Sequence, residues 1–577
     1  MVKRIAACVR EYRRDSLLTP LYVALEVLLE VLIPLVMADL IDRGIEAGDM
    51  GHILRTGAVL VVMALFSLTF GVLSGRYAAR ASAGLAKNLR RDIYYNVQNF
   101  SFSNLDKFST AGIVTRLTTD VTNVQNAYQM LIRVAVRCPL MLVFAFTMTV
   151  RINPRIALIY LCVIPVLAVG LVLIITRVHA LFTRVFRTYD QLNGVVQENL
   201  LGIRVVKSFV REEHEKEKFG AVSGALFRGF SRAEKLIAFN MPLMQLCVYT
   251  CMLLVSWIGA RLVVGGDMTT GELTSLFNYT MQILMSLMML SMVLVMVIMA
   301  RTSSERIAEI LSEESDLKDG PAPVTEVPDG SVDFEHVGFS YAGDPERLSL
   351  KNVDLHIRSG ETVGILGGTG TSKSTLVQLI PRLYDATLGT VKVGGIDVRD
   401  YDLEVLRDQV AMVLQKNTLF SGTIKENLRW GNEQATDEEL VRACRLAQAD
   451  GFIREFPDGY DTYIEQGGSN VSGGQKQRLC IARALLKRPK ILILDDSTSA
   501  VDTKTDALIR RAFQEEIPGT TKFIIAQRVS SVEDADHILI LEGGQIAAFG
   551  THEELVASSP IYQEVYASQT KGGNEDA

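Results

Sequence analysis

The sequence predicts a multidomain protein: an all-α membrane domain with six spans, followed by an α/β domain. Three observations support this fold class. The chain has 577 residues, more than one hydrophobic core organises, so at least two domains are expected. Its mean hydropathy of +0.22 comes almost wholly from the first half, where apolar runs recur that are long enough to cross a bilayer. After residue 330, strand patterns alternate with helix patterns.

Composition narrows the class of protein further. The net charge is only −6 and 21% of the residues are charged, which does not indicate a nucleic-acid partner. The seven cysteines lack the spacing of a metal site, and several lie in apolar segments. We therefore expect reduced cysteines that contribute to packing.

The membrane domain is expected to cover residues 1–310 and to begin with a basic, amphipathic helix on the cytoplasmic side. Lys and Arg gather there and again at 76–91, and cytoplasmic segments carry the excess of these residues. We therefore expect an integral protein of a bacterial cytoplasmic membrane with both termini in the cytoplasm, although Arg151 and Arg155 fall on the outer side. The six expected spans lie at about 17–42, 54–76, 128–150, 154–177, 239–262 and 273–299.

Two long polar segments separate these spans, at 76–125 and 177–234. Their residues favour helix, so the spanning helices are expected to continue well beyond the membrane. The pattern breaks at 101–112 and 202–209, where a short transverse helix is expected to face a cytoplasmic partner. The alternative is a pair of long polar loops.

Charged side chains inside the expected spans are candidates for a substrate pathway. Glu26 and Glu30 share a face of the first span, and Arg133 and Arg137 share a face of the third. Charges inside a bilayer are costly. These groups are therefore expected either to pair for structural reasons or to form an acidic patch that favours cationic amphiphiles.

The sixth span carries a stripe of methionines, including Met285, Met288 and Met292, at helical spacing. Methionine is flexible and polarizable, and it is common on surfaces that accept varied apolar ligands. The stripe is expected either to pack in the core or to line a permissive cavity.

An acidic, proline-containing linker is expected at 311–330, and the α/β domain is expected to cover 331–570. The last residues, from Gln569 onward, are small and polar and look disordered. We assign 571–577 as a disordered tail.

In the α/β domain, an apolar strand at 362–366 runs into a glycine-rich loop that ends in a lysine and two hydroxyl residues. This spacing is close to that of a P-loop, whose backbone N–H groups hold phosphates, whose lysine reaches the β and γ phosphates and whose hydroxyl binds Mg²⁺. The loop residues are Gly367, Gly368, Thr369, Gly370, Thr371, Ser372, Lys373, Ser374 and Thr375.

A second stretch, 470–502, contains two further features that handle phosphate. Small residues open a helix whose N-terminal N–H groups can meet a phosphate directly. Downstream, an apolar strand at 491–494 delivers Asp495 and Asp496 at its carboxyl end, where open α/β sheets bind their ligands. The helix opens with Ser472, Gly473, Gly474 and Gln475.

These motifs occur in the order seen in ATP-binding cassette (ABC) proteins. Tyr341 precedes the P-loop and Gln415 follows it. The chain as a whole resembles a half-transporter of the ABC exporter fold, because six expected spans stand ahead of this series. The remaining motifs are VSGGQ at 471–475, ILILDD at 491–496, SAVD at 499–502 and AQR at 526–528.

The resemblance implies ATP and Mg²⁺ as cofactors, with Tyr341 stacking on adenine. It also implies that Leu419 and Phe420 belong to the surface on which family members seat their transverse helices. The implied metal ligands are Ser374, Gln415 and Asp495.

Three positions depart from the family pattern. Asp496 stands where the family carries a glutamate that orients or deprotonates water, and it is one methylene shorter. Gln527 replaces a switch histidine and cannot carry an imidazolium charge. Ser372 replaces the last glycine of the P-loop, where a left-handed backbone costs a serine about 1–2 kcal/mol. Nucleotide binding is therefore expected to be weakened and not abolished.

These departures, beside an intact Ser472-Gly473-Gly474-Gln475 segment, resemble the degenerate subunit of a heterodimeric exporter. The implied partner is a second, non-identical half-transporter that supplies the glutamate and the histidine, and the expected cargo is amphipathic, such as drugs or lipids. Three alternatives remain: an exporter of a peptide or a glycolipid, a metallophore importer on the exporter fold, and a nucleotide-gated channel or regulatory subunit.

Overall fold

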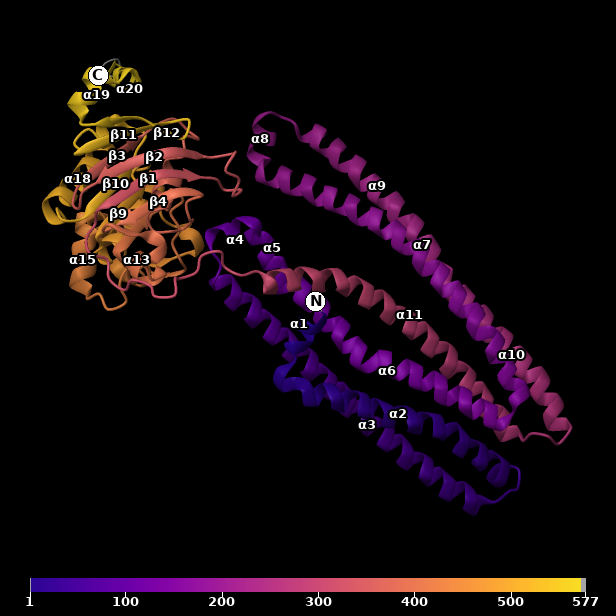
Figure 1. The fold of residues 1–577 in the computed structure, drawn as a ribbon. Helices are drawn as coiled ribbons and strands as arrows, with labels where there is room; N and C mark the ends of the chain where they lie inside the picture. The colour runs from indigo at the N-terminus through magenta and orange to yellow at the C-terminus, as the bar shows by residue number, and fades with distance from the viewer. Residues whose placement is uncertain (1, 572–577) are drawn as a thin grey trace. The chain divides into compact units, whose positions relative to one another are not determined.

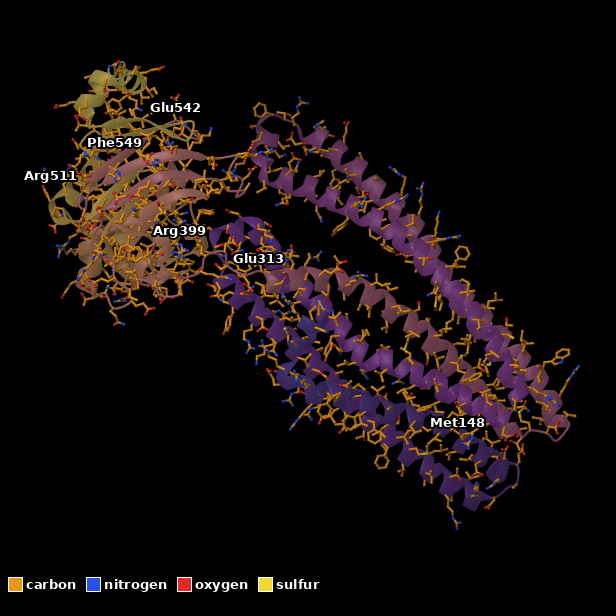
Figure 2. All side chains as sticks on the ribbon, in the orientation of Figure 1. Met148, Glu313, Arg399, Arg511, Glu542 and Phe549 are labelled. Atoms are coloured by element: carbon orange, nitrogen blue, oxygen red, sulfur yellow. The ribbon has the colours of Figure 1, made fainter. Side chains whose placement is uncertain are left out.

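The computed structural model describes residues 2–571, which form two compact units (Figure 1). The first unit comprises the chain up to Asn99 together with Ser109–Glu313. The second comprises Phe100–Phe108 and the described chain from Glu314 onward. Figure 2 shows the side chains on the same ribbon, with Glu313 labelled where the first unit ends. Of the expected tail at 571–577, only Lys571 lies within the described residues.

Among the described residues, six helical segments are long and apolar enough to cross a membrane. Each of them encloses one of the expected spans, which confirms the six-helix prediction. The spanning helices are α2 (Arg13–Asp39, continued by a π-helical turn, Leu40–Ile45), α3 (Met50–Gln98), α6 (Val121–Ile152), α7 (Pro154–Leu201), α10 (Asn240–Val264) and α11 (Thr270–Ser312).

Local sequence explains where two of these helices begin. The Asn153 side chain accepts a hydrogen bond from the Arg155 N–H at 3.0 Å, and Pro154 occupies the first position of α7. At α11, Thr269 and Glu272 form a capping box. The turns before α7 and α11 are therefore fixed by their own side chains.

The core of the membrane unit gathers one face of α2 with α6, α7, α10 and α11. Val23, Val27 and Val31 recur every four residues on α2 and are buried. The Tyr279 hydroxyl of α11 donates to the Val31 carbonyl at 2.7 Å. The outer face of α3 is apolar but exposed, as at Leu65, and in a bilayer such a face contacts lipid.

Short helices form at both predicted breaks, α4 (Phe102–Lys107) and α8 (Ile203–Ser208). The long polar segments around them are helical, because α3 and α7 continue through them and α9 (Glu212–Ala238) follows α8. The prediction of short helices at the two breaks is confirmed, and the alternative of long polar loops is wrong. The two other short helices of this half are α1 (Val2–Ala7) and α5 (Thr110–Thr115).

The second unit contains a six-stranded sheet in the order β12-β11-β3-β10-β9-β6 and a four-stranded sheet in the order β2-β1-β4-β5. In the larger sheet all neighbours are parallel except β11 and β12. The strands are β1 (Val332–Phe339), β2 (Leu350–Ile357), β3 (Thr362–Leu366), β4 (Leu388–Val393), β5 (Ile396–Asp397), β6 (Val410–Val413), β7 (Gly422–Thr423), β8 (Tyr463–Ile464), β9 (Ile491–Asp495), β10 (Thr521–Ile525), β11 (His537–Glu542) and β12 (Gln545–Gly550).

Both faces of the six-stranded sheet are buried, which is why its strands are continuous apolar runs. On β9, Ile491 and Ile493 join the core shared with the smaller sheet, while Leu492 and Leu494 face the core formed with the helices. The helices of this unit are α12 (Lys373–Gln378), α13 (Leu403–Gln409), α14 (Ile424–Arg429), α15 (Asp437–Leu446), α16 (Asp450–Glu455), α17 (Gly473–Leu486), α18 (Thr503–Glu516), α19 (His552–Ser558) and α20 (Pro560–Lys571).

Candidate nucleotide site

The site is assembled at the carboxyl ends of three neighbouring parallel strands of the larger sheet, β3, β10 and β9 (Figure 1). The glycine-rich loop follows β3, Asp495 ends β9, and Gln527 lies two residues beyond β10. Because β10 lies between the other two strands, the switch position falls between the loop and the aspartates. This edge is where open α/β sheets bind ligands.

The backbone of the loop requires glycine at two points. Gly367 has φ +154°, and a Cβ there would lie 2.5 Å from the Leu541 carbonyl oxygen. Gly370 has φ +84°. The Lys373 ammonium donates to the carbonyls of Gly367 and Gly368 at 2.8 and 2.7 Å, so it lies against the loop that would hold phosphate. Burial lowers the pKa of Lys373.

Ser372 adopts the left-handed backbone expected of a glycine, with φ 67° and ψ 26°. The sequence prediction that this position needs unusual backbone freedom is therefore confirmed. Thr371 and Thr375 stand on either side of residues 372–374. The Thr371 hydroxyl donates to the Gly368 carbonyl at 2.9 Å.

Two of the three predicted metal ligands are in contact. The Ser374 hydroxyl donates to Asp495 Oδ1 at 3.0 Å, and burial raises the pKa of the Asp495 carboxyl. A hydroxyl and a carboxylate are the oxygen ligands that Mg²⁺ prefers, so this pair fits the ion. Gln415, the third predicted ligand, lies two residues beyond β6 and is exposed.

The two altered catalytic positions touch each other. Gln527 Nε2 donates to Asp496 Oδ2 at 2.8 Å. Asp496 is 9% exposed, has φ 50° and is fixed by its N–H, which donates to the Ile525 carbonyl at 3.1 Å. The sequence placed both residues at one nucleotide site, but it did not predict their direct hydrogen bond.

Tyr341 is 53% exposed, which leaves ring surface free to stack on a base. Its hydroxyl lies 2.9 Å from Thr375 Oγ1, and its ring meets the Phe339 ring edge-on at 4.8 Å between centroids. This arrangement ties the predicted adenine-stacking residue to the helix that begins with Lys373.

Sequence reasoning missed Tyr384, which joins Tyr341 to the transverse helix α4. The rings of Tyr341 and Tyr384 are 5.4 Å apart, and the Phe102 ring of α4 lies 6.0 Å from Tyr384. The Tyr384 hydroxyl donates to Asp106 at 2.7 Å. Burial, and to a smaller extent the Asp106 carboxylate, raises the pKa of Tyr384. The sequence carries no signal for this contact, because Asp106 and Tyr384 lie 278 residues apart and meet only in the folded chain.

The pair expected to seat transverse helices has a different character at each position. Leu419 is buried, whereas Phe420 stacks on Trp430 at 4.1 Å between centroids and remains exposed. Within the second unit, α4 contacts Tyr384.

The predicted phosphate-binding helix, α17, begins with a complete capping box. Ser472 Oγ accepts from the Gln475 N–H at 3.3 Å, and Gln475 Oε1 accepts from the Ser472 N–H at 2.9 Å. A Cβ on Gly474 would lie 2.7 Å from the Ala500 carbonyl oxygen, whereas one on Gly473 would meet the Ala500 Cβ at 3.5 Å. The segment at 499–502 therefore packs directly on this helix start.

In the membrane unit, Arg137 bridges the two acidic residues predicted for a substrate pathway. Its guanidinium donates to Glu26 at 2.6 Å and to Glu30 at 2.7 Å. Arg133 lies instead beside Gly75, where a Cβ would be 3.6 Å from its Nη1. The structure thus shows the expected pairing for Arg137, but its one guanidinium is shared by two carboxyl groups.

The methionine stripe divides between two environments. Met285 and Met292 are 49% and 62% exposed, whereas Met288 packs against the membrane core. The stripe therefore contributes to packing at one position and to an accessible apolar face at two others.

Six helices able to span a membrane, ahead of a P-loop domain with a hydroxyl–carboxylate pair that fits Mg²⁺, are the features of an ATP-driven membrane transporter. The chain belongs to the ABC transporter family. Residues 17–303 match the model described as ABC transporter transmembrane region, and residues 350–499 match the model described as ABC transporter. It is therefore an integral membrane protein whose second domain is an ABC ATPase.

Relatives agree with this assignment. The chain is 38% identical over 544 residues, 94% of each protein, to the uncharacterized ABC transporter ATP-binding protein YfiB of Bacillus subtilis. It is 32% identical over 514 residues to an ATP-dependent lipid A-core flippase of Desulfotalea psychrophila, covering 88% of this chain and 89% of the relative. Its fold is similar to that of a bacterial Atm1-family ABC exporter with ATP bound, with TM-score 0.83 and 24% identity over 96% of this chain and 99% of that one.

Proposed function

We propose that the chain is the degenerate-site subunit of a heterodimeric ABC exporter that moves amphipathic compounds, such as lipids or drugs, out of a bacterial cytoplasm. Its partner is a second half-transporter that carries the usual glutamate and histidine. The observation that carries the proposal is the Asp496–Gln527 hydrogen bond, which joins the two altered residues at 2.8 Å.

The chain's own P-loop site is suited to bind ATP and poorly suited to cleave it. The loop, Lys373 and the Ser374–Asp495 pair remain for binding, and Mg²⁺ bound there would neutralise charge on the phosphates. Asp496 is too short to take the place of glutamate without a shift of its backbone, and its carboxylate already accepts from Gln527. Errors of about 1 Å in such a group cost ~100-fold in rate.

The chain's signature segment serves the other site. In the family, each ATP lies between the P-loop of one cassette and the signature of the other. Ser472 with the first N–H groups of α17 presents dipole and donors to a phosphate held by the partner. The partner's site then performs most of the hydrolysis, and the site formed by this chain's P-loop holds nucleotide for longer.

The membrane residues support an amphipathic cargo. Glu26 and Glu30 face the single guanidinium of Arg137, so these three groups carry one net negative charge when ionised, and Met285 and Met292 offer flexible apolar surface on α11. The similarity to a lipid A-core flippase is consistent with a lipid-like cargo.

The test compares the chain alone with the chain purified beside a candidate partner in the same nanodiscs. We expect weak ATP hydrolysis by the chain alone, brisk hydrolysis by the pair, and uptake of labelled amphiphile into inverted vesicles only with the pair. Brisk hydrolysis and pumping by the chain alone would refute the proposal. Flux down a gradient without ATP turnover would instead favour a nucleotide-gated channel.

A further inference from the structure

The C-terminal helix α20 holds the backbone of the switch segment through one side chain. Gln569 Oε1 accepts a hydrogen bond from the Val529 N–H at 2.8 Å, and Gln569 Nε2 donates to the Gln527 carbonyl at 3.0 Å. A single primary amide thus binds both sides of Arg528. Residues of a neighbouring parallel strand make this same pair of bonds, so Gln569 acts as a one-residue extension of the sheet beyond β10.

The rest of α20 is anchored independently of Gln569. The Tyr562 hydroxyl lies 2.6 Å from His552 Nδ1 of α19 and is buried, and the Tyr562 and Tyr566 rings stack at 6.2 Å. A cavity of about 280 Å³ is lined by Tyr562 and Val565 together with P-loop and switch residues. The helix is therefore fixed on the domain by its first two turns, and Gln569 follows one turn later.

The backbone that Gln569 grips is the one that carries the switch side chain. Gln527 Nε2 donates to Asp496 at 2.8 Å, so a change in the φ or ψ of Gln527 would displace its side-chain amide relative to Asp496. Two net hydrogen bonds are enough to bias such a local equilibrium strongly.

We propose that Gln569 is a positioning residue for ATP hydrolysis, and that α20 sets the switch segment at 527–529 by clamping its backbone. The clamp acts on main-chain atoms, so it is independent of which side chain stands at 527. This inference rests on the proposed function in one respect, the assignment of the switch role to Gln527.

The first test measures amide hydrogen exchange on the full-length chain in nanodiscs. Gln569→Ala removes both hydrogen bonds, so exchange of the peptide covering 526–531 is expected to rise by about five-fold or more. Gln563→Ala is the matched control, because Gln563 lies on the same helix and donates to the Val556 carbonyl of α19. Gln569→Glu keeps only the acceptor and is expected to fall between wild type and Gln569→Ala.

The second test separates positioning from folding. In the Asp496→Glu, Gln527→His background, Gln569→Ala is expected to lower kcat for ATP by about ten-fold with KM nearly unchanged, since only the alignment of the switch group is lost. Gln563→Ala should leave both constants as they are.

The outcomes divide cleanly. Unchanged exchange at 526–531, equal effects of Gln569→Ala and Gln563→Ala, or faster exchange with unchanged kcat would each overturn the clamp. A failure of the proposed degenerate site appears elsewhere, as brisk hydrolysis by the wild-type chain alone, and does not affect the exchange result.

Discussion

The proposed function gives the chain two regions that meet nucleotide, the P-loop region and the signature region, and assigns them different fitness for cleavage. In the P-loop region, Ser372 holds a strained backbone and Asp496 is occupied by Gln527. In the signature region, Ser472 completes a capping box, and Gly474 packs so closely that an added Cβ would lie 2.7 Å from the Ala500 carbonyl oxygen. Under the proposed function, this contrast means that the chain binds nucleotide in its own pocket and supports cleavage of the nucleotide held by its partner.

The largest expected effect comes from the intact region. In the assembled pair, Ser472→Ala should lower total ATP hydrolysis on the order of 100-fold, because it removes a group that meets the phosphate at the fast site. Asp496→Asn should change hydrolysis far less. Steady-state turnover of the two variants checks the contrast, and equal losses would contradict the assignment of the sites.

Loss of a helix cap has its own cost, typically ~1 kcal/mol. Thr436→Ala is the matched control, because Thr436 forms the capping box of α15 with Glu439. Its unfolding midpoint should shift like that of Ser472→Ala, while its turnover stays near wild type.

A gain of at most similar size is expected from restoring the family's residues in the P-loop region. Asp496→Glu with Gln527→His should raise turnover at the chain's own site by up to ~100-fold, since the longer carboxylate and the imidazole regain the geometry for activating water. Single-turnover hydrolysis with the partner's catalytic glutamate replaced isolates this site. No gain in that assay would show that the slow step at this site lies outside these two residues.

The P-loop serine should produce a more modest change. Ser372→Gly removes a left-handed cost of about 1–2 kcal/mol, which corresponds to about 5- to 30-fold tighter nucleotide binding when the free loop relaxes out of this conformation and binding restores it. Equilibrium binding of a fluorescent ATP analogue measures it. Gln448→Gly is the control, because Gln448 also has positive φ, 54°, and lies at the end of α15. It should raise stability without changing the affinity.

The sequence predicted the six spans, the strands that carry the P-loop and the aspartates, and the left-handed Ser372, because each depends on local pattern. It could place Asp496 and Gln527 at one site only through the family resemblance, and the hydrogen bond between them needed the parallel neighbours β9 and β10. Tyr384 carried no signal, because its role arises from a tertiary contact with α4.

Gln569 was missed for the opposite reason. Its small, polar neighbours predicted disorder, which is wrong for this residue: α20 continues to Lys571 and Gln569 makes two hydrogen bonds to the switch segment. Composition reports how much apolar surface a segment can bury. Composition does not reveal that the side-chain amide of Gln569 hydrogen-bonds the backbone of residues 527 and 529.

The smallest expected effect lies in the membrane unit, and it tests whether cargo choice is independent of the two nucleotide regions. Glu30→Gln removes the surplus negative charge of this cluster but leaves the Glu26–Arg137 pair at 2.6 Å intact, so the half-buried guanidinium keeps a partner. Transport of a cationic amphiphile should fall about five-fold relative to a neutral one, the effect of roughly 1 kcal/mol of lost attraction.

The double variant Glu26→Gln, Glu30→Gln shows whether that fall reflects charge or structure. It leaves Arg137 without either carboxylate, and should therefore lose stability as well as cation preference.

The ratio of turnover between Ser472→Ala and Asp496→Asn should be the same in wild-type and Glu30→Gln backgrounds, because the charge on the cargo affects its binding in the membrane unit and not the difference between the two nucleotide sites. An unchanged cation-to-neutral ratio would leave Glu26, Glu30 and Arg137 as a structural cluster only.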